Sequence, residues 1–482
     1  MRQVISRGLP QLVLRLGRVT EVVLLMGEIT DPAWVAALTA SLGGVPVHLA
    51  VARDLGSSSG GPQHLGTDGR AVLWDALSGK EVLVWAHNLS VGRNLPLLRH
   101  LSECCAAAGA RLWLHHHDWW WDGRWARWAD WLAAGVKDLE EALEYSLPTG
   151  SHIRHWCINH ADLSWVQLRA GDAARWVGNP LPDLNLPDGN LVHEAAAWLR
   201  TKTGGRRVWL APVRALRRKN LAEAIYLAQQ QEQRTCVVTT GGPASPQEIP
   251  AWETLCQAAA RHHWPFVPGV LASGAQLCQP LPLWCHLSPA ALIAAADAIV
   301  MPSLQEGFGL PYLEAAAMGK PLLARALPDA MANLAALGCT LRSPYHKLVV
   351  APEAFDAAME STRLEQRWAL LPSALPEELK LDLDPIQPAE GMDFGCLSLE
   401  TQLEVLQSNG GSPQPLPQPQ IPHWPASHRI DQWADRFFPT LPEEGRHSDE
   451  SGRQNVRPPR GLLLAEVLRR FWYWQQHPLL WP

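Results

Sequence analysis

The sequence predicts an α/β protein built from two doubly wound, Rossmann-like domains with a C-terminal extension. Short apolar runs of strand length alternate with helix-compatible segments over residues 21–375. A stretch rich in Pro, Asn and Asp, residues 177–189, separates two such series and is typical of a hinge. At 482 residues, the chain is also too long for a single hydrophobic core.

The strands expected in the first domain are EVVLLMG, VPVHLAVA, VLVWAHN, RLWLHHH and HWCINH. Those expected in the second domain are VWLAP, CVVTTGG, WPFVP, AIVMPS and PLLAR. Beyond about residue 375 the composition turns Pro-, Gln- and acid-rich, which favours an extended linker. We therefore expect an N-terminal extension (1–20), the two domains (21–185 and 186–375), a Pro-rich linker (376–425) and a helical tail (426–482).

Composition narrows the class of protein. The formal net charge of -6 argues against general nucleic-acid binding. The nine cysteines include no C-x-x-C pair, and we expect them to be reduced thiols. No apolar run reaches the length of a membrane span, and arginines interrupt the first 20 residues where a signal peptide would need an apolar core. We expect a cytoplasmic enzyme.

The most informative stretch is ADAIVMPSLQEGFGLPYLEAAAMGKPLLAR, residues 296–325. Ala298–Met301 is expected as a buried strand, and Pro311 suits the first turn of the helix that follows. Gly307 and Gly309 allow a tight turn and a close approach of the backbone to a ligand. The segment thus predicts a strand, a loop and a helix N-terminus, an arrangement that favours phosphate or hydroxyl oxygens.

Two carboxylates flank this turn, with Glu306 in the loop and Glu314 one turn into the helix. Both can face one crevice, where a carboxylate accepts hydrogen bonds from vicinal sugar hydroxyls. A second segment, RRVWLAPVRALRRKN, runs from a strand into a loop with four cations. The cations are Arg214, Arg217, Arg218 and Lys219.

The pattern P-S-x-x-E-G-F-G-L-P-x-x-E-A resembles the signature of the family-4 glycosyltransferases, nucleotide-sugar enzymes of GT-B fold. The resemblance implies that Glu314 holds the nucleotide ribose, and that Arg214 and Lys219 grip the donor diphosphate. It further implies that the donor sugar lies near the segment from Glu306 to Leu310, that is Glu306, Gly307, Phe308, Gly309 and Leu310. This chain departs from the family after the lysine, where Asn220 stands in place of a common Gly.

The first domain carries weaker signals at the ends of two strands. His87, Asn88, His117 and Asp118 follow the strands VLVWAHN and RLWLHHH, where ligands of α/β sheets bind. The resemblance implies a histidine that touches donor sugar and acceptor, and we assign it to His117 rather than His115 or His116. His87, Asn88 and Asp118 are acceptor-side candidates.

Three adjacent histidines also suggest a metal, but successive side chains of an extended segment point to alternate faces. No paired Cys or second His motif supplies further ligands, so we expect no metal and no cofactor. Asp382 and Asp384 form a D-x-D that we assign to a solvated linker. The nearby tryptophans, Trp119–Trp121, Trp125 and Trp128, suit a core better than a sugar platform.

Three interpretations of the tail compete: packing on the catalytic domains, binding a partner, and lying on a membrane surface. The third would use Arg460, Arg469 and Arg470 as a basic edge. We favour packing, because tryptophan-rich helices usually bury their apolar side.

Together these features predict a retaining, metal-independent hexosyltransferase acting on a nucleoside diphosphate sugar and an unidentified acceptor, which could be a glycan, a lipid-linked molecule or a small molecule. Retention rests on the resemblance alone. Two alternatives stay open: a GT-B nucleotide-sugar epimerase, and a non-catalytic glycosyltransferase-like binding protein.

Overall fold

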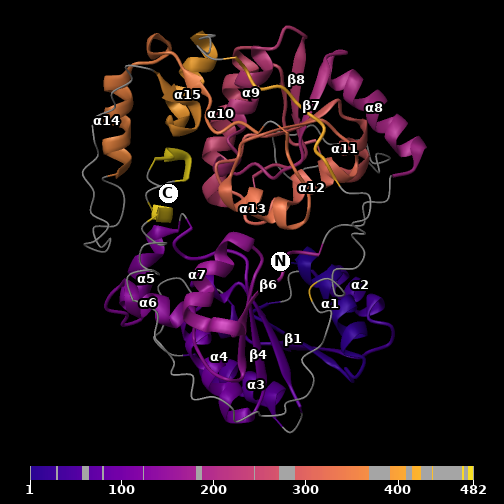
Figure 1. Cartoon of the computed structure of the whole chain (residues 1–482), viewed down its shortest axis with the longest axis vertical. Coiled ribbons are helices and arrows are strands. Elements are labelled where there is room, and N and C mark those ends of the chain that lie inside the picture. Colours follow the sequence, from indigo (N-terminus) through magenta and orange to yellow (C-terminus); the bar gives the residue numbers. More distant parts are fainter. Residues whose placement is uncertain are drawn as a thin grey trace. The chain divides into compact units, whose positions relative to one another are not determined.

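The computed structural model describes residues 2–28, 31–56, 65–78, 81–122, 124–180, 187–243, 245–270, 288–342, 344–368, 391–408, 415–424, 437, 469–471 and 476–480. The chain divides into two compact units. The N-terminal unit comprises Met1–Pro182, Pro372–Lys380 and Arg429–Trp472, and the C-terminal unit comprises Asp183–Leu371, Leu381–His428 and Tyr473–Pro482. The main division therefore falls inside the stretch expected to be a hinge (Figure 1).

The N-terminal unit contains only parallel strand pairs among its described residues. β1 (Val22–Met26) pairs with β2 (Val47–Val51). A second sheet has the order β3-β4-β5-β6. Its strands are β3 (Leu83–His87), β4 (Arg111–His116), β5 (Ile153–Cys157) and β6 (Ala174–Trp176). The five predicted strands are all present, whereas the three-residue β6 was not predicted because it is too short to show a periodic pattern.

The helices of this unit are α1 (Arg2–Leu16), α2 (Pro32–Ser41), α3 (Thr67–Leu77), α4 (Leu95–Ala108), α5 (Trp128–Ala133), α6 (Leu139–Ser146) and α7 (His160–Ala170). Several begin where the side chain of an Asp or Asn accepts a first-turn N–H, as Asn94 does for α4 and Asp138 for α6. Helix α1 lies in the segment expected to be an extension, but its Leu12 is buried in a core cluster of this unit.

Alternation along β4 divides its side chains between two cores. Leu112 and Leu114 pack in a leucine-rich cluster with residues of α3 and α4. Trp113 faces the other way and packs with Trp156 and with Leu12 of α1. The odd-numbered residues of β4 therefore share one face of the sheet, and the even-numbered ones share the other.

The C-terminal unit is built on a five-stranded sheet in which each neighbouring pair is parallel, with the order β11-β10-β7-β8-β9. The strands are β7 (Arg207–Ala211), β8 (Thr235–Thr239), β9 (Phe266–Val267), β10 (Ala298–Met301) and β11 (Leu322–Ala324), all at predicted positions. β7 has β8 on one side and β10 on the other, so the strand order reverses there. The parallel sheets of the two units confirm the predicted pair of doubly wound, Rossmann-like domains, although β1 and β2 of the N-terminal unit form a sheet apart from β3–β6.

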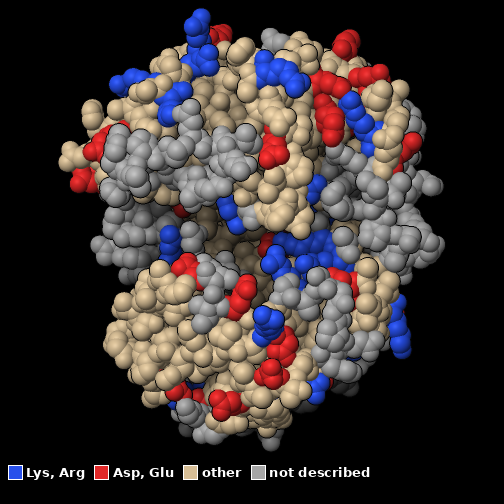
Figure 2. Space-filling view, turned by 180° about the vertical axis from the view of Figure 1, so that it is seen from behind, with Lys and Arg blue, Asp and Glu red and all other residues tan. Residues whose placement is uncertain are grey.

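The helices here are α8 (Gly189–Thr203), α9 (Leu221–Gln229), α10 (Ile249–Arg261), α11 (Pro289–Ala295), α12 (Leu310–Ala317), α13 (Pro328–Ala336), α14 (Ala357–Trp368) and α15 (Leu399–Ser408). In Figure 1, α8 lies beside α11, and α15 lies beside α9. A short antiparallel pair, β12 (Val349–Val350) and β13 (Met392–Asp393), joins α15 to the unit. On the face that Figure 2 shows, basic and acidic side chains are interspersed over this unit.

The segment 376–425, which was expected to be an extended linker, contains folded elements. Its described residues include β13 and α15, and Phe394, Leu397, Val405 and Leu406 are buried. The Pro-rich run itself extends the sheet at its edge, because Gln420 exchanges two backbone hydrogen bonds with Leu322 of β11, at 2.8 and 3.1 Å. Proline is tolerated on an edge strand when its missing N–H is not needed for the ladder. Asp382 and Asp384 lie outside the described residues.

The described part of the tail is packed. Arg470 is 8% exposed and forms ion pairs with Asp122, at 2.6 Å, and with Asp162, while Phe471 is fully buried against Trp125. Trp119, Trp120, Trp121 and Trp125 are also buried, so they are core residues. Arg470 therefore cannot serve as a membrane-facing cation, whereas Arg469 is exposed and Arg460 lies outside the described residues. Within the part of the chain that is described, no helix is long and apolar enough to cross a membrane.

Candidate active site

Two loops meet at the carboxyl ends of β7 and β10, the neighbouring strands where the order of the sheet reverses. The first loop carries the basic residues and ends in the 3-10 helix η5 (Arg217–Lys219). The second loop contains Glu306 and leads into α12. The backbone N–H of Leu304 donates to the carbonyl of Arg218 at 2.8 Å, which joins the loops. Such a switch point is the usual ligand site of an open α/β sheet.

The centre of this site is a contact between Lys219 and Glu306, which are 87 residues apart in sequence. Lys219 Nζ donates to Glu306 Oε1 at 2.5 Å. The exposed fractions of the two residues are 7% and 9%. Arg218 supports the same loop, since its Nη1 donates to the carbonyl of Gln305 at 2.5 Å and lies 3.9 Å from Glu306 Oε2. The structure thus brings together two residues that the sequence placed in separate motifs.

Electrostatics in this site depend on burial and on the local excess of cations. Burial, together with the charges of Arg218 and Arg214, lowers the pKa of Lys219 to about 8 despite the opposing effect of Glu306. Burial would raise the pKa of Glu306, but the charges of Lys219 and Arg218 outweigh it and hold that pKa below its ordinary value. Glu306 is therefore a carboxylate at neutral pH, and Lys219 is a cation whose charge is sensitive to pH.

The loop from Glu306 to Leu310 is shaped for close approach. Gly309 has a φ of 90° and caps α12 without any side-chain hydrogen bond. Phe308 is buried, and its carbonyl accepts a hydrogen bond from Asn333 Nδ2 at 3.2 Å. Asn333 also donates to the carbonyl of Gly307 at 3.4 Å. Sequence reasoning missed Asn333, although a polar residue in the apolar helix PDAMANLAA was a usable signal.

The backbone conformation of Asn220 explains how this chain can have asparagine where the family commonly has glycine. Asn220 adopts left-handed backbone angles, φ 50° and ψ 48°, at the start of α9. Gly and Asn are the residues that adopt this conformation most readily, so Asn220 can do there what a glycine would do. Its side chain adds hydrogen bonds that glycine lacks, to Glu223 Oε2 at 2.6 Å and from Gln402 Nε2 at 3.2 Å.

The other predicted donor-site residues lie around this centre. Arg214 is exposed in the loop after β7. The loop after β8 approaches it so closely that a Cβ on Gly241 would lie 3.0 Å from Arg214 Cα. Glu314 is half-buried one turn into α12, and Leu310 begins that helix.

A buried network behind the site was not predicted. Arg325, at the end of β11, donates to both carboxylate oxygens of Glu223 at 2.8 and 2.6 Å and to those of Asp393 at 2.8 and 2.7 Å. Tyr345 donates to Glu223 at 2.6 Å. This network ties α9, which follows the basic loop, to β11 and β13. The residues of this network come from segments that are far apart in the sequence. From the sequence alone, their charged side chains were expected to lie in solvent.

The acceptor-side candidates lie together in the N-terminal unit. His87 Nδ1 and His117 Nε2 are 3.1 Å apart. Asn88 uses its Oδ1 to accept the backbone N–H groups of His117 and Asp118, at 3.3 and 2.9 Å. Asp118 lies 3.2 Å from Arg124. Asn88 therefore positions the loop after β4, a role that its residue type did not reveal.

The three adjacent histidines separate as expected. His116 points to the opposite face of the sheet and is 2.9 Å from His155, while His115 and His117 share a face with ring centroids 4.5 Å apart. Burial lowers the pKa of His115 to about 4 and also lowers that of His117, aided there by the neighbouring histidines. These rings are neutral at physiological pH.

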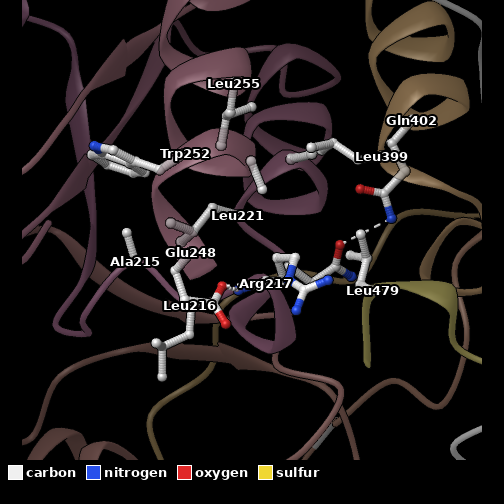
Figure 3. Close-up of a pocket in the computed structure, with 13 residues that line it drawn as sticks. Ala215, Leu216, Arg217, Leu221, Glu248, Trp252, Leu255, Leu399, Gln402 and Leu479 are labelled. Atoms are coloured by element: carbon white, nitrogen blue, oxygen red, sulfur yellow. Dashed lines mark hydrogen bonds and ion pairs between the residues drawn. The ribbon is translucent and has the colours of Figure 1, made fainter. Parts of the chain in front are cut away.

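A small cavity in the C-terminal unit lies near the basic loop (Figure 3). Its lining is mostly apolar and includes Leu221, Trp252, Leu255, Leu399 and Leu479. Its volume of about 40 Å³ accommodates a few water molecules and is far too small for a nucleotide sugar. The cavity is packing space behind η5 and α9.

Comparison with known proteins gives the class of the enzyme. Residues 217–362 match the family model described as "Glycosyl transferases group 1". The matched region includes Lys219, Glu306 and Glu314. The C-terminal unit thus carries a glycosyltransferase domain, and the protein is a glycosyltransferase, as predicted. Assignment to family 4 and the roles of the two glutamates stay predictions.

Solved structures give weaker similarities. HepE from Anabaena in complex with UDP is 17% identical, with a TM-score of 0.44, over 67% of this chain and 79% of that chain. WaaG, a glycosyltransferase involved in lipopolysaccharide biosynthesis, is 15% identical with a TM-score of 0.42, over 70% and 81%. The α,α-trehalose 6-phosphate synthase of Burkholderia multivorans is 12% identical with a TM-score of 0.41, over 66% and 86%. These values are too low to argue function. No curated protein matches the chain.

Proposed function

We propose that this glycosyltransferase moves a hexose from a nucleoside diphosphate sugar to an acceptor hydroxyl with retention of configuration. One observation carries the proposal: Lys219 Nζ and Glu306 Oε1 are 2.5 Å apart at the switch point of the C-terminal unit. A buried ammonium is suited to a diphosphate, and a buried carboxylate to the hydroxyls of a sugar. A nucleotide sugar presents both groups side by side.

In this proposal the diphosphate replaces Glu306 as the partner of Lys219, and Arg214 also binds the diphosphate. Glu314 accepts the hydroxyls of the ribose. Glu306, freed from Lys219, and the backbone from Gly307 to Gly309 hold the donor sugar. The N-terminal helix turn of α12 adds its dipole, which favours negative charge near its first residues.

The chemical step follows from the charge on the leaving group. The bond between the anomeric carbon and the diphosphate oxygen breaks, and that oxygen gains negative charge, which the two cations stabilise. The acceptor hydroxyl attacks from the same face and passes its proton to the departing diphosphate, so no protein nucleophile is used. His117, with His87, Asn88 and Asp118 as neighbours, is proposed to contact the acceptor side. Mg²⁺ and Mn²⁺ are not required, since the cations already neutralise the diphosphate.

The experiment combines ligand binding with turnover. A thermal-shift panel of UDP-, GDP- and ADP-sugars identifies the donor, because a ligand at about a hundred times its Kd adds about 2.7 kcal/mol of stability. With that donor, Lys219→Met should lower kcat/KM by about 10- to 150-fold, the equivalent of one charge-assisted hydrogen bond. Lys202→Met, on the surface of α8, is the control and should keep the wild-type rate.

Three outcomes would contradict the proposal. If none of these donors stabilises the protein, the donor site is misassigned. If a donor binds but no acceptor releases free nucleoside diphosphate, the protein is a binding protein. If the sugar changes configuration without any acceptor, it is an epimerase.

A further inference from the structure

Three histidines of the N-terminal unit converge on one face of the sheet. His87 ends β3 and is paired in register with His115 of β4. His117 lies two residues beyond His115, so both point to the same side of the extended chain. Alternation within the run His115–His117 brings two of these rings to one face, and the neighbouring strand β3 supplies the third.

The spacing of the rings suits a metal ion. One ring nitrogen from each of His87, His115 and His117 lies within 4.8 Å of the other two. The closest pair, His87 Nδ1 and His117 Nε2, is 3.1 Å apart. Tetrahedral zinc with Zn–N bonds of about 2.0–2.1 Å holds its ligand nitrogens about 3.4 Å apart. Ring rotations that close the longest of these separations by at most about 1.4 Å would complete this geometry.

The orientation of His115 supports the same conclusion. Its Nε2 lies 3.0 Å from the carbonyl oxygen of Val177, and a carbonyl can only accept, so Nε2 carries the proton. The lone pair is then on Nδ1, which is buried and has no hydrogen-bond partner among the described residues. A backbone carbonyl that fixes the tautomer of a histidine is a common feature of metal sites.

The three rings do not satisfy one another by hydrogen bonds alone. His87 Nδ1 and His117 Nε2 share one contact at 3.1 Å, which leaves His115 Nδ1 without a hydrogen-bond partner among the described residues.

We propose that His87, His115 and His117 bind one divalent transition-metal ion of the zinc type, with water in the fourth position. Three imidazole nitrogens suit Zn²⁺, Co²⁺ or Cu²⁺, whereas Mg²⁺ and Ca²⁺ prefer oxygen ligands. The site joins β3 to β4 within the N-terminal unit. Two of its ligands, His87 and His117, are also the residues proposed for the acceptor side, whereas the cations of the proposed transfer step lie in the C-terminal unit.

The test uses the full-length chain after removal of metals by a chelator and dialysis. Titration with ZnCl₂ in a calorimeter should show one tight site, and CoCl₂ should give the visible absorption of a tetrahedral cobalt complex. His87→Gln, His115→Gln and His117→Gln should each weaken zinc binding by about 100-fold or more, since removing a ligand costs more than removing its supporting residue.

His116→Gln is the matched control, because His116 is a buried histidine of the same strand that faces His155 on the other side. It should retain both zinc affinity and the cobalt spectrum. Cys396→Ser tests the other candidate cluster, in which Asp393, Cys396 and His477 approach one another. If circular dichroism shows that His115→Gln does not fold, the test relies on His117→Gln, because His117 is only half-buried.

The proposal is overturned if the wild-type chain binds no zinc. It is also overturned if His116→Gln lowers the affinity as much as His117→Gln does, or if Cys396→Ser alone abolishes binding. None of these readouts depends on transferase activity, so the metal site and the proposed function can fail separately.

Discussion

At the scale of single residues, the contact between Lys219 and Glu306 decides how the candidate site responds to ligand and pH. Each group keeps the other charged in a buried place where neither would be stable alone. A diphosphate that binds Lys219 has to displace this partner, and the carboxylate is then available for the sugar. The pair therefore keeps the empty site charged and ordered.

The lowered pKa of Lys219 predicts a pH-dependent affinity for the free nucleoside diphosphate. Lys219 loses its proton as the pH rises through about 8, and the neutral amine no longer attracts the anion. The contribution of Lys219 to affinity should be nearly constant below about pH 7 and should fall by up to about tenfold per pH unit above about pH 8. Lys219→Arg should bind with no such break, because arginine stays protonated. Calorimetry between pH 6.5 and 9.5 checks this, and an unchanged pH profile in Lys219→Arg would contradict it.

Glu314 is expected to contribute to nucleotide affinity rather than to the stability of the fold, because it is only half-buried. Glu314→Ala should weaken binding of the nucleoside diphosphate by about 10- to 150-fold, the loss of a charged acceptor for the ribose hydroxyls. Glu353→Ala removes an exposed carboxylate of the same unit and is the control. Equal affinity in wild type and a folded Glu314→Ala would remove Glu314 from the site.

At the scale of elements, α9 is the helix that connects the basic loop to the rest of the C-terminal unit. It begins at Asn220 in a left-handed conformation and is tied through Glu223 to Arg325 and Asp393. Arg325 is 3% exposed, and removing either carboxylate would leave its charge poorly compensated. The position of Lys219, one residue before Asn220, depends on this arrangement.

Two substitutions at Asn220 separate its backbone role from its side-chain role. Asn220→Gly keeps the left-handed conformation but loses the hydrogen bonds with Glu223 and Gln402. Asn220→Ala loses those bonds and also has to adopt a conformation that alanine disfavours by about 1–2 kcal/mol. Urea unfolding should rank stability as wild type, then Gly, then Ala, with about 1 kcal/mol between the two variants. Equal stability of the two variants would show that the turn relaxes.

At the scale of the whole molecule, the end of the chain contributes to both units. Residues 469–471 belong to the N-terminal unit, where Arg470 lies against Asp122 and Asp162, and 476–480 belong to the C-terminal unit. Trp119 and Trp165 also donate their Nε1–H groups to Asp162, at 2.9 and 3.3 Å. The tail is therefore a structural part of the two units.

Arg470→Met should destabilise the N-terminal unit strongly. It leaves the buried carboxylates of Asp122 and Asp162 without their cation, and breaking a buried pair in this way costs about 3–5 kcal/mol. Arg175→Met removes an exposed charge of the same unit and should leave the melting temperature unchanged. Differential scanning calorimetry distinguishes the two. A stable Arg470→Met would mean that the tail packs only weakly.

Much of the fold could be predicted from local pattern. Strands such as Ala298–Met301 and Arg111–His116 are apolar runs between turn residues, and the phase of their side chains follows from alternation. Helix α12 could be predicted because Gly309 and Pro311 mark its start. Pattern was misleading for residues 391–408 and 415–424, where a packed helix and an isolated bridge to the edge of the sheet lie in a segment expected to be a linker. Whether such a segment packs depends on which surface meets it.

The sequence by itself therefore determined the parallel strands of both units, the catalytic class and the identity of the charged loops, because each is encoded within a few consecutive residues. Only the tertiary structure decided which of these residues meet. Lys219 meets Glu306 because β7 and β10 are neighbours in the sheet, and His87 joins His115 and His117 because β3 pairs with β4 in that register. Arg470 meets Asp122 and Asp162 across more than 300 residues. Such contacts arise from strand order and packing, which connect positions that no local spacing relates.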